Sequence, residues 1–209
     1  MSITLSQLEK SLLYSEELGI ALNKKTDQQY FKWFLASLLF GGHISETIAK
    51  NTYRAFEHHG LLTPKKIVAA GRDYLVFPIM REGGYVRYDG RKSDQILRDC
   101  RMLLAEYDGS LIKLHEMARD NQDLESRLLA FYGVGPVTVN IFLRELRPYW
   151  RKAEPELLPI VVEKAAQSGL DLSAYDRKTI TFTRIEAGLI RCRKEKHLVT
   201  LPSGGGAPD

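Results

Sequence analysis

The stretch of sequence that decides the fold is Leu128-Leu-Ala-Phe-Tyr-Gly-Val-Gly-Pro-Val-Thr-Val-Asn140. It predicts a helix that ends at a Gly-Val-Gly turn, Gly133 to Gly135, and a second helix that begins at once. Glycine adopts positive φ and allows close backbone approach, and the second helix presents unpaired N–H groups and a positive dipole end. Such a hairpin can bind a phosphate oxygen without a cationic side chain. The alternative is a purely structural turn in which Val134 fills a core.

Helix signals dominate the rest of the chain and predict an all-α fold. Tyr30–Phe40 is apolar on nearly every side, as a helix at the centre of a core would be. A long amphipathic helix is expected over Ser93–Glu106, after a turn at Asp89-Gly90. Only Thr179–Thr183 alternates like a strand, and it has no partner in the sequence. The other expected helix starts are the capping boxes Ser6–Glu9 and Thr183–Glu186, the caps Asp27, Ser45, Thr63, Ser110 and Asp123, and the first-turn prolines Pro64, Pro136 and Pro155.

Composition excludes several classes of protein. The 209 residues are 44% hydrophobic and 27% charged, so the chain is not disordered as a whole, and only residues 201–209 are expected to form a flexible tail. No apolar run approaches the roughly 18 residues that cross a bilayer, and acidic residues near the start do not fit a secretory signal. Cys100 and Cys192 are too few for a four-thiolate cluster or a disulfide framework. These features predict a cytoplasmic monomer without a membrane partner.

The net charge is +4 at pH 7, and basic residues gather near the end of the sequence. Such a run can bind phosphates, although a solvated helix face also explains it. The run comprises Arg177, Lys178, Arg184, Arg191, Arg193, Lys194 and Lys196, against Glu186 and Glu195.

The residues around the Gly-Val-Gly turn resemble the helix-hairpin-helix of the endonuclease III superfamily of DNA glycosylases. Leu35–Lys50 is similar to the family's early buried helix, its turn and the next helix, and Val86–Leu104 is similar to a basic turn that leads into a long helix. The similarity covers residues 28–165. It implies a two-lobed all-α glycosylase fold, with a six-helix barrel domain over residues 27–142 and a second helical domain from residues 1–26 and 143–200.

The resemblance also implies how double-stranded DNA would bind. DNA would lie across the cleft between the two domains, with the target base turned out of the helix. The hairpin would hold a phosphate through backbone amides, assisted by a monovalent cation on its carbonyl oxygens. His43 is the side chain available to fill the space that the base leaves, although a histidine in a turn is more often only solvated. Aromatic and basic residues alternate from Tyr85 to Lys92, a pattern suited to stacking and phosphate contact, although a charged surface loop explains it equally well. The predicted DNA-binding residues are His43, Arg87, Arg91, Lys92, Gly133, Val134, Gly135, Val137 and Thr138.

The sequence departs from the family at the residues that carry chemistry. Val137 stands where bifunctional members have the lysine that forms a Schiff base, so a monofunctional enzyme is expected. No aspartate lies at the start of the following helix, where the family's carboxylate stabilises the cationic sugar. Glu154 and Glu156 are the candidates for this catalytic role, and the apolar residues three and six positions later favour Glu154. The alternative is that both glutamates only complement a helix N-terminus.

The sequence therefore predicts a base-excision repair glycosylase that hydrolyses the N-glycosidic bond of a damaged or mismatched base in DNA. An alternative from another class is a DNA-binding protein that keeps the scaffold without the chemistry, and a third is an interaction module with a structural hairpin. No cofactor is expected, because the cysteines of the family's iron–sulfur cluster are missing. No metal site is expected either, because His58, His59 and His115 lack companions at metal-ligand spacing.

Overall fold

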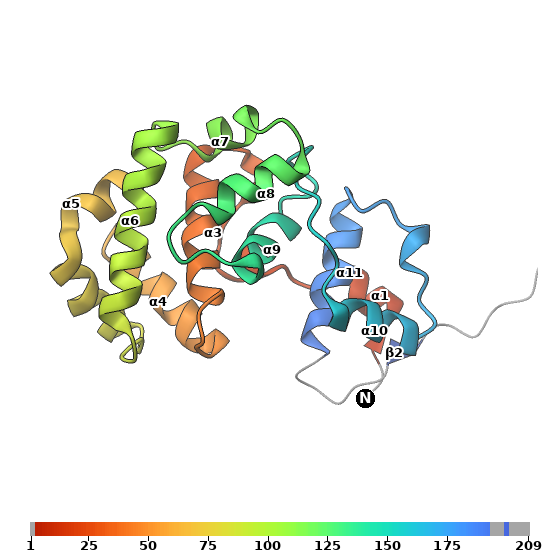
Figure 1. The fold of residues 1–209 in the computed structure, drawn as a ribbon. Helices are drawn as coiled ribbons and strands as arrows, with labels where there is room; N and C mark the ends of the chain where they lie inside the picture. The colour runs from red at the N-terminus through yellow and green to blue at the C-terminus, as the bar shows by residue number, and fades with distance from the viewer. Residues whose placement is uncertain (1–2, 193–198, 201–209) are drawn as a thin grey trace, which may run out of the picture. The chain divides into compact units, whose positions relative to one another are not determined.

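The computed structural model describes residues 3–192 and 199–200, and within these ranges the protein is all-α (Figure 1). The expected tail, residues 201–209, lies outside the described residues, as do Arg193, Lys194 and Lys196 of the basic run. The pair of strands in the described part, β1 (Ile3–Thr4) and β2 (Val199–Thr200), is parallel and only two residues long. None of the described helices is long and apolar enough to cross a membrane.

The chain divides into two compact units. The large unit comprises residues 18–155, and the small unit comprises residues 1–17 together with residues 156–209. The division expected from the sequence lay at residues 26/27 and 142/143. The structure thus groups nine residues before the barrel and thirteen after it, 18–26 and 143–155, with the large unit.

Side-chain contacts explain these boundaries. The side-chain oxygen of Gln29 accepts a hydrogen bond from the N–H of Ala21 (2.9 Å), which fixes the segment before the first long helix. The ring of Trp150 packs edge-on against Tyr30 and Phe142, with centroids 5.1 and 5.6 Å apart. Each contact with Trp150 brings the segment after residue 142 onto the core of the large unit.

The centre of the large unit is α3 (Asp27–Phe40), as the sequence predicts. Nearly every residue from Gln29 to Leu39 is buried. α4 (Glu46–His58) and α9 (Pro136–Arg144) pack against α3, and the indole N–H of Trp33 donates to the backbone oxygen of Phe142 in α9 (3.0 Å). The other helices of the large unit are the 3₁₀ helix η1 (Leu22–Lys24), α5 (Pro64–Tyr74), the π-helix η2 (Leu75–Met80), α6 (Asp89–Tyr107), α7 (Leu111–Met117) and α8 (Asn121–Leu129).

Three of the expected helix caps are confirmed. The hydroxyls of Ser45, Thr63 and Ser110 accept hydrogen bonds from the first turns of α4, α5 and α7. The cap of α3 is Thr26 rather than Asp27. The Asp27 carboxylate instead accepts a hydrogen bond from the hydroxyl of Ser110 (2.9 Å), a contact between residues 83 positions apart.

Two further helix starts in the large unit lie earlier than expected. α6 begins at Asp89, so the residues expected to form a turn before Ser93 are its first turn. α8 is capped by Asp120, whose carboxylate accepts from the N–H of Asp123 (2.8 Å). The Asp123 carboxylate accepts from the N–H of Arg119 (2.9 Å), so this aspartate supports the cap from inside the helix.

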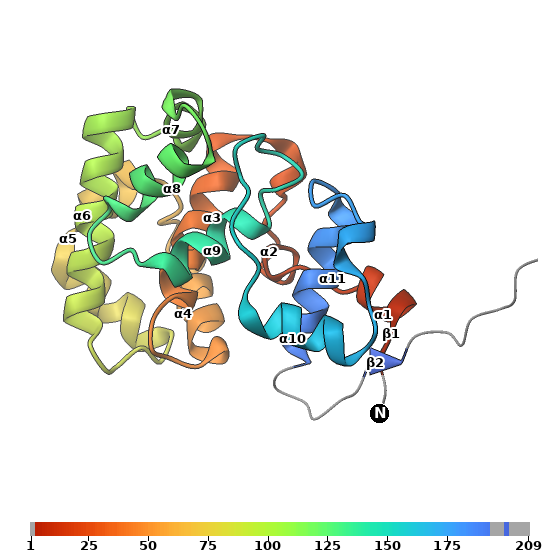
Figure 2. The same ribbon diagram turned by 45° about the vertical axis from the view of Figure 1, so that its right-hand side comes forward.

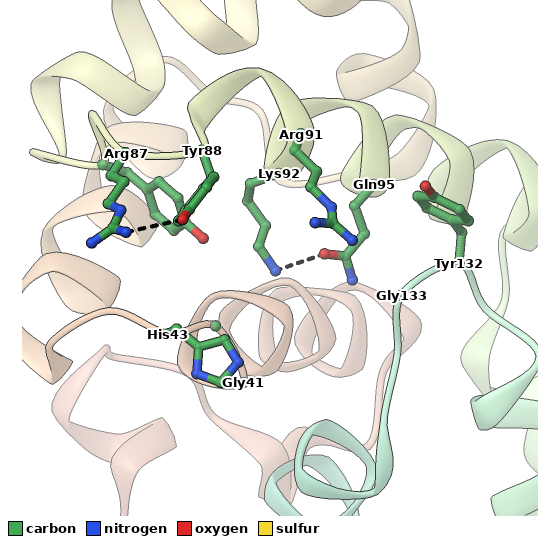
Figure 3. Close-up of a pocket in the computed structure, with 11 residues that line it drawn as sticks. Gly41, His43, Arg87, Tyr88, Arg91, Lys92, Gln95, Tyr132 and Gly133 are labelled. Carbon is green, nitrogen blue, oxygen red and sulfur yellow. Dashed lines mark hydrogen bonds between the residues drawn. The ribbon is translucent and has the colours of Figure 1, made fainter.

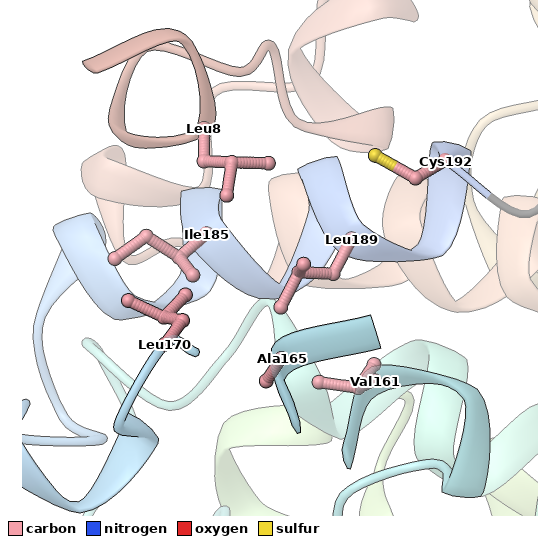
Figure 4. Packing of buried hydrophobic residues seen from close by; sticks show 7 residues of the cluster. All are labelled: Leu8, Val161, Ala165, Leu170, Ile185, Leu189 and Cys192. Carbon is pink, nitrogen blue, oxygen red and sulfur yellow. The ribbon is translucent and has the colours of Figure 1, made fainter. Parts of the chain in front are cut away.

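The small unit is built from both ends of the sequence (Figure 2). Leu8 packs with Ile185 and Leu189 on one side of its core, and Val161 and Ala165 belong to the same cluster of buried side chains (Figure 4). The helices of the small unit are α1 (Leu5–Glu9), α2 (Tyr14–Glu17), α10 (Pro159–Gln167), the 3₁₀ helix η3 (Leu172–Ala174) and α11 (Ile180–Arg191).

The expected starts in the small unit are also shifted. The capping box of α1 is Thr4 with Gln7, two residues before the expected Ser6. Thr179 caps α11 through the N–H of Phe182, so Thr179–Thr183 is a helix start and not a strand, and Thr183 lies inside the helix. The starts of α1 and α11 were mispredicted for the same reason. Several hydroxyl residues lie close together in each segment, and tertiary packing selects the one that caps the helix.

Candidate functional site

The hairpin predicted from the sequence is present between α8 and α9. Gly133 has φ +69°, in the left-handed region that favours glycine. Gly135, which caps α9, has φ −109° and ψ 176°, an extended conformation open to any residue. Positive φ is therefore required at the first glycine only. Val134 between them is 7% exposed, so it packs inward as the structural interpretation of the turn expects.

The N-terminus of α9 faces outward without a side-chain cap. Pro136 has no N–H, and the N–H groups of Val137 and Thr138 have no acceptor within the helix because they belong to its first turn. The Val137 side chain is 61% exposed, whereas the Thr138 side chain is buried. An anion at this helix end would therefore bind to the backbone N–H groups of Val137 and Thr138 and not to their side chains.

Thr138 is buried because α9 crosses α3 very closely at the end of α3. A Cβ placed on Gly41 would lie 2.0 Å from Thr138 Oγ1 and 3.0 Å from Thr138 Cβ. Any other residue at this position would require Thr138 or one of the two helices to shift. The crossing holds the Gly41-Gly42-His43 turn beside the hairpin.

A cavity of about 700 Å³ opens in the large unit beside this turn (Figure 3). Three parts of the large unit surround it: the turn after α3, the segment before α6 together with the first two turns of α6, and the hairpin. It therefore brings together five of the predicted DNA-binding residues, His43, Arg87, Arg91, Lys92 and Gly133, and the other predicted site residues are not among its lining residues. The lining residues are Gly41, Gly42, His43, Tyr85, Arg87, Tyr88, Arg91, Lys92, Gln95, Tyr132 and Gly133.

The rim of the cavity combines exposed aromatic rings with guanidinium groups. Tyr88 is 57% exposed, and the guanidinium of Arg87 lies 4.9 Å from its ring centroid and donates to its hydroxyl (3.0 Å). Tyr132 is also exposed, with the guanidinium of Arg98 4.2 Å from its ring centroid. Exposed rings and cations side by side suit a partner with flat rings and negative charge.

Lys92 is buried in the cavity wall and does not lie on the surface as a lysine that contacts phosphate would. Its Nζ donates to the backbone oxygen of Leu38 (2.9 Å) and to Oε1 of Gln95 (2.7 Å). Burial lowers the pKa of this amine to about 8, although the negative charge of Asp99 opposes the shift. The interaction with Gln95 is drawn in Figure 3, where both side chains point toward the His43 side of the cavity.

Asp99 extends the same buried stripe of α6 away from the cavity. It is completely buried, and neither carboxylate oxygen has a hydrogen-bond partner of good geometry among the described residues. Burial raises its pKa to about 7, against the opposing effects of the Tyr132 backbone and Lys92. Asp99 is not among the residues predicted from the sequence, although polar residues at positions 92, 95 and 99 share one face of the helix with Ile96. Polar residues on an otherwise apolar face were the available signal.

The predicted catalytic glutamates do not lie at a helix N-terminus. α10 begins at Pro159, with Leu158 as its cap, so Pro155 is not a first-turn proline. Glu154 lies with Oε1 3.7 Å from Nε of Arg147, whose side chain is fully buried and also donates to the backbone oxygen of Pro155 (2.8 Å). Glu156 is exposed and belongs to the small unit. The sequence pattern could not predict the pairing of Glu154 with Arg147, because the two residues do not lie in one continuous helix.

Comparison with known proteins gives no family for this chain. No protein-family model matches it, and no curated protein matches it either.

Proposed function

We propose that this protein binds double-stranded DNA through the α8–α9 hairpin and hydrolyses the N-glycosidic bond of a damaged or mismatched base that turns into the adjacent cavity. The observation that carries the proposal is that the hairpin and the cavity share Gly133. A phosphate held at the N-terminus of α9 would place its nucleotide next to a space of suitable size and chemistry. The resemblance of the hairpin to that of the endonuclease III superfamily supports the same function.

The cavity suits a base. Its volume of about 700 Å³ lies within the range of roughly 300–1,000 Å³ of small-ligand pockets. Gln95 and Lys92 offer polar groups for the edge of a base, and Tyr88 and Tyr132 offer ring faces for stacking. A flipped base needs both kinds of contact, because it loses its stacking and pairing partners in the duplex.

DNA binding without catalysis is the second candidate, and a specific observation favours it. Val137 stands where a catalytic lysine would be, and Glu154 faces the buried Arg147, so its carboxylate has a structural role. Lys152, the nearest amine along the sequence, does not replace the lysine. Its Nζ donates to the backbone oxygens of His115, Glu116 and Ala118.

The DNA-binding step is tested by a charge placed at the hairpin. A Cβ added at Gly135 would meet no atom within 4 Å, and Asp and Asn are both good caps, so Gly135→Asp and Gly135→Asn should fold equally well. Gly135→Asp should weaken duplex affinity by about tenfold more than Gly135→Asn at low salt, because only its carboxylate repels phosphate. The measurement is fluorescence anisotropy with labelled duplex over a salt series. Equal affinities of the two folded variants would remove the hairpin from the interface.

The catalytic step is tested by base release from a panel of lesion-bearing duplexes. Release from one or more lesions supports the glycosylase, and binding without release from any lesion supports the second candidate. Borohydride added to active reactions should trap no covalent adduct, because Val137 cannot form a Schiff base. An adduct would show that the enzyme is bifunctional, and its loss in Lys92→Met would identify the amine.

A further inference from the structure

A cluster of two imidazoles and a carboxylate lies outside the cavity, where α4 ends. His58 is the last residue of α4 and His59 is its C-cap, while Glu82 directly precedes the Gly83-Gly84 turn. Nδ1 of His58 lies 3.0 Å from one carboxylate oxygen of Glu82, and Nε2 of His59 lies 2.8 Å from the other. The three ligand atoms lie within 4.8 Å of one another. The sequence gives no sign of this cluster, because Glu82 is more than twenty residues away from the histidines.

Close packing on α4 places Glu82 opposite the histidines. A Cβ on Gly83 would lie 2.3 Å from Cα of Thr52, so only glycine allows this approach to α4. Thr52 lies between one and two helical turns before His58, which brings the residue before Gly83 close to the end of the helix. The backbone contact between Gly83 and Thr52 therefore holds Glu82 near the histidines, in addition to the hydrogen bonds of the side chains.

The orientation of His59 is also fixed. Its Nδ1 lies 2.9 Å from the hydroxyl of Tyr74, so Nε2 is the ring nitrogen that faces Glu82. The ring of Tyr74 packs edge-on against the imidazole, with centroids 5.7 Å apart. A hydrogen bond to the second nitrogen is how proteins orient and tune an imidazole that binds a metal. The side chain of His59 is 19% exposed, whereas that of His58 is 73% exposed and can rotate toward an ion.

We propose that His58, His59 and Glu82 form a binding site for a divalent transition-metal ion, with Zn²⁺ as the best match. Two imidazoles with one carboxylate are a common donor set for zinc, and calcium or magnesium would require mostly oxygen donors. Ligand atoms around tetrahedral zinc lie about 3.3 Å apart, given bonds of roughly 2.0–2.1 Å. The His58 side chain is 73% exposed and therefore has room to rotate and bring its nitrogen closer to the other two ligand atoms. The bound ion replaces the two hydrogen bonds between the imidazoles and the Glu82 carboxylate.

Charge favours a cation at this position. The carboxylate of Glu82 brings a negative charge to the cluster at neutral pH. The cluster also lies at the C-terminus of α4, where the helix dipole is negative. Three protein ligands leave a fourth position for water or another ligand, and this site does not depend on the proposed DNA chemistry.

The test is titration of the chelator-treated protein, residues 1–209, with ZnCl₂ by calorimetry and with CoCl₂ by visible absorption. We expect one ion per chain with micromolar or tighter affinity, a cobalt band with four-coordinate intensity, and no response to MgCl₂. Glu82→Gln and the double variant His58→Gln/His59→Gln should each weaken zinc binding at least tenfold. Glu57→Gln, the same change at an exposed neighbour on α4, should leave zinc affinity unchanged.

Tyr74→Phe is the variant that tests orientation. It keeps the ring and removes the hydroxyl bonded to His59, so zinc affinity should fall by about 10-fold. Circular dichroism and thermal unfolding check that each variant remains folded. The proposal is overturned if wild-type protein binds zinc no more tightly than about 100 μM, far weaker than dedicated zinc sites. It is also overturned if the folded Glu82→Gln and double-histidine variants bind zinc as the wild type does.

Discussion

Asp99 shows how the burial of a single residue changes the pH at which its side chain becomes charged. Its carboxyl group is enclosed in α6 behind the cavity, with a pKa raised to about 7. An ordinary aspartate in the unfolded chain has a pKa near 3.8. Between these values the folded state binds more protons than the unfolded state, so stability falls as the pH rises. Lys92, with its pKa lowered to about 8, adds a rise in stability only at more alkaline pH.

Asp99→Asn should therefore remove most of the loss of stability between pH 5 and pH 8. Asparagine has the shape and neutrality of the protonated acid, so the stability of the variant relative to wild type should rise by about 2–3 kcal/mol between pH 5 and pH 8. Urea denaturation of both proteins at the two pH values measures the difference. If both lose the same stability on going to pH 8, Asp99 is ionised in the folded protein at either pH.

Glu154 and Glu156 separate structure from catalysis. Glu154→Gln removes the carboxylate that lies 3.7 Å from Nε of the buried Arg147 and should lower the free energy of unfolding by about 1–2 kcal/mol, less than for a fully buried pair because Glu154 is partly exposed. Glu156→Gln, at an exposed site, should change it by less than about 0.5 kcal/mol. Base release is then compared below the unfolding temperature of both variants. A loss of about 100-fold in Glu154→Gln alone would assign catalysis to Glu154 despite its pairing with Arg147.

Close contacts between helices determine the geometry of the cavity more than the helix propensity of each segment does. α3 and α9 meet where Gly41 faces Thr138, and this contact sets the hairpin beside the cavity. Gly133 meets α6 in a similar way, because a Cβ there would lie 3.2 Å from Cδ of Gln95. Two glycines thus determine the spacing of the three segments around the cavity.

Gly41→Ala should destabilise the protein by about 2 kcal/mol, since the added methyl group overlaps Thr138 and forces the helices apart. Adding Thr138→Ala should recover part of this loss, because it removes the nearest atom. Gly135→Ala is the control, since its methyl group meets no atom within 4 Å. Chemical denaturation of the single and double variants gives the coupling energy. Equal and small losses for Gly41→Ala and Gly135→Ala would contradict the close crossing.

The sequence predicts helices well and their starts less well. Tyr30–Phe40 was correctly expected to form the central helix, because a segment apolar on all sides has no other stable place. Asp27 and Asp123 were wrong as caps, because each carboxylate has a tertiary or reciprocal partner that local sequence does not reveal. Several of the aromatic and basic residues between Tyr85 and Lys92 line the cavity, and their role in binding DNA stays a prediction. Asp99 and the His58–His59–Glu82 cluster were missed, because their environments exist only after distant segments pack.

At the scale of the whole molecule, the large unit is one continuous segment inserted into the small unit. The hairpin, the cavity and the proposed metal site all lie within residues 18–155. Residues 18–155 expressed alone should therefore fold, with a cooperative thermal transition and near-ultraviolet circular dichroism from buried Trp33 and Trp150. Residues 156–192 alone should not fold, because Leu8 completes their core. A large-unit fragment without a cooperative transition would show that its core needs the small unit.

The insertion also imposes an order on events during synthesis at the ribosome. Leu8 is made early, but its partners Ile185 and Leu189 emerge only after the whole of the large unit. Until then α1, a helix of five residues, has no packing partner and is too short to persist alone. In the nascent chain, residues 18–155 should therefore fold first, while residues 1–17 remain unfolded. The small unit should fold last.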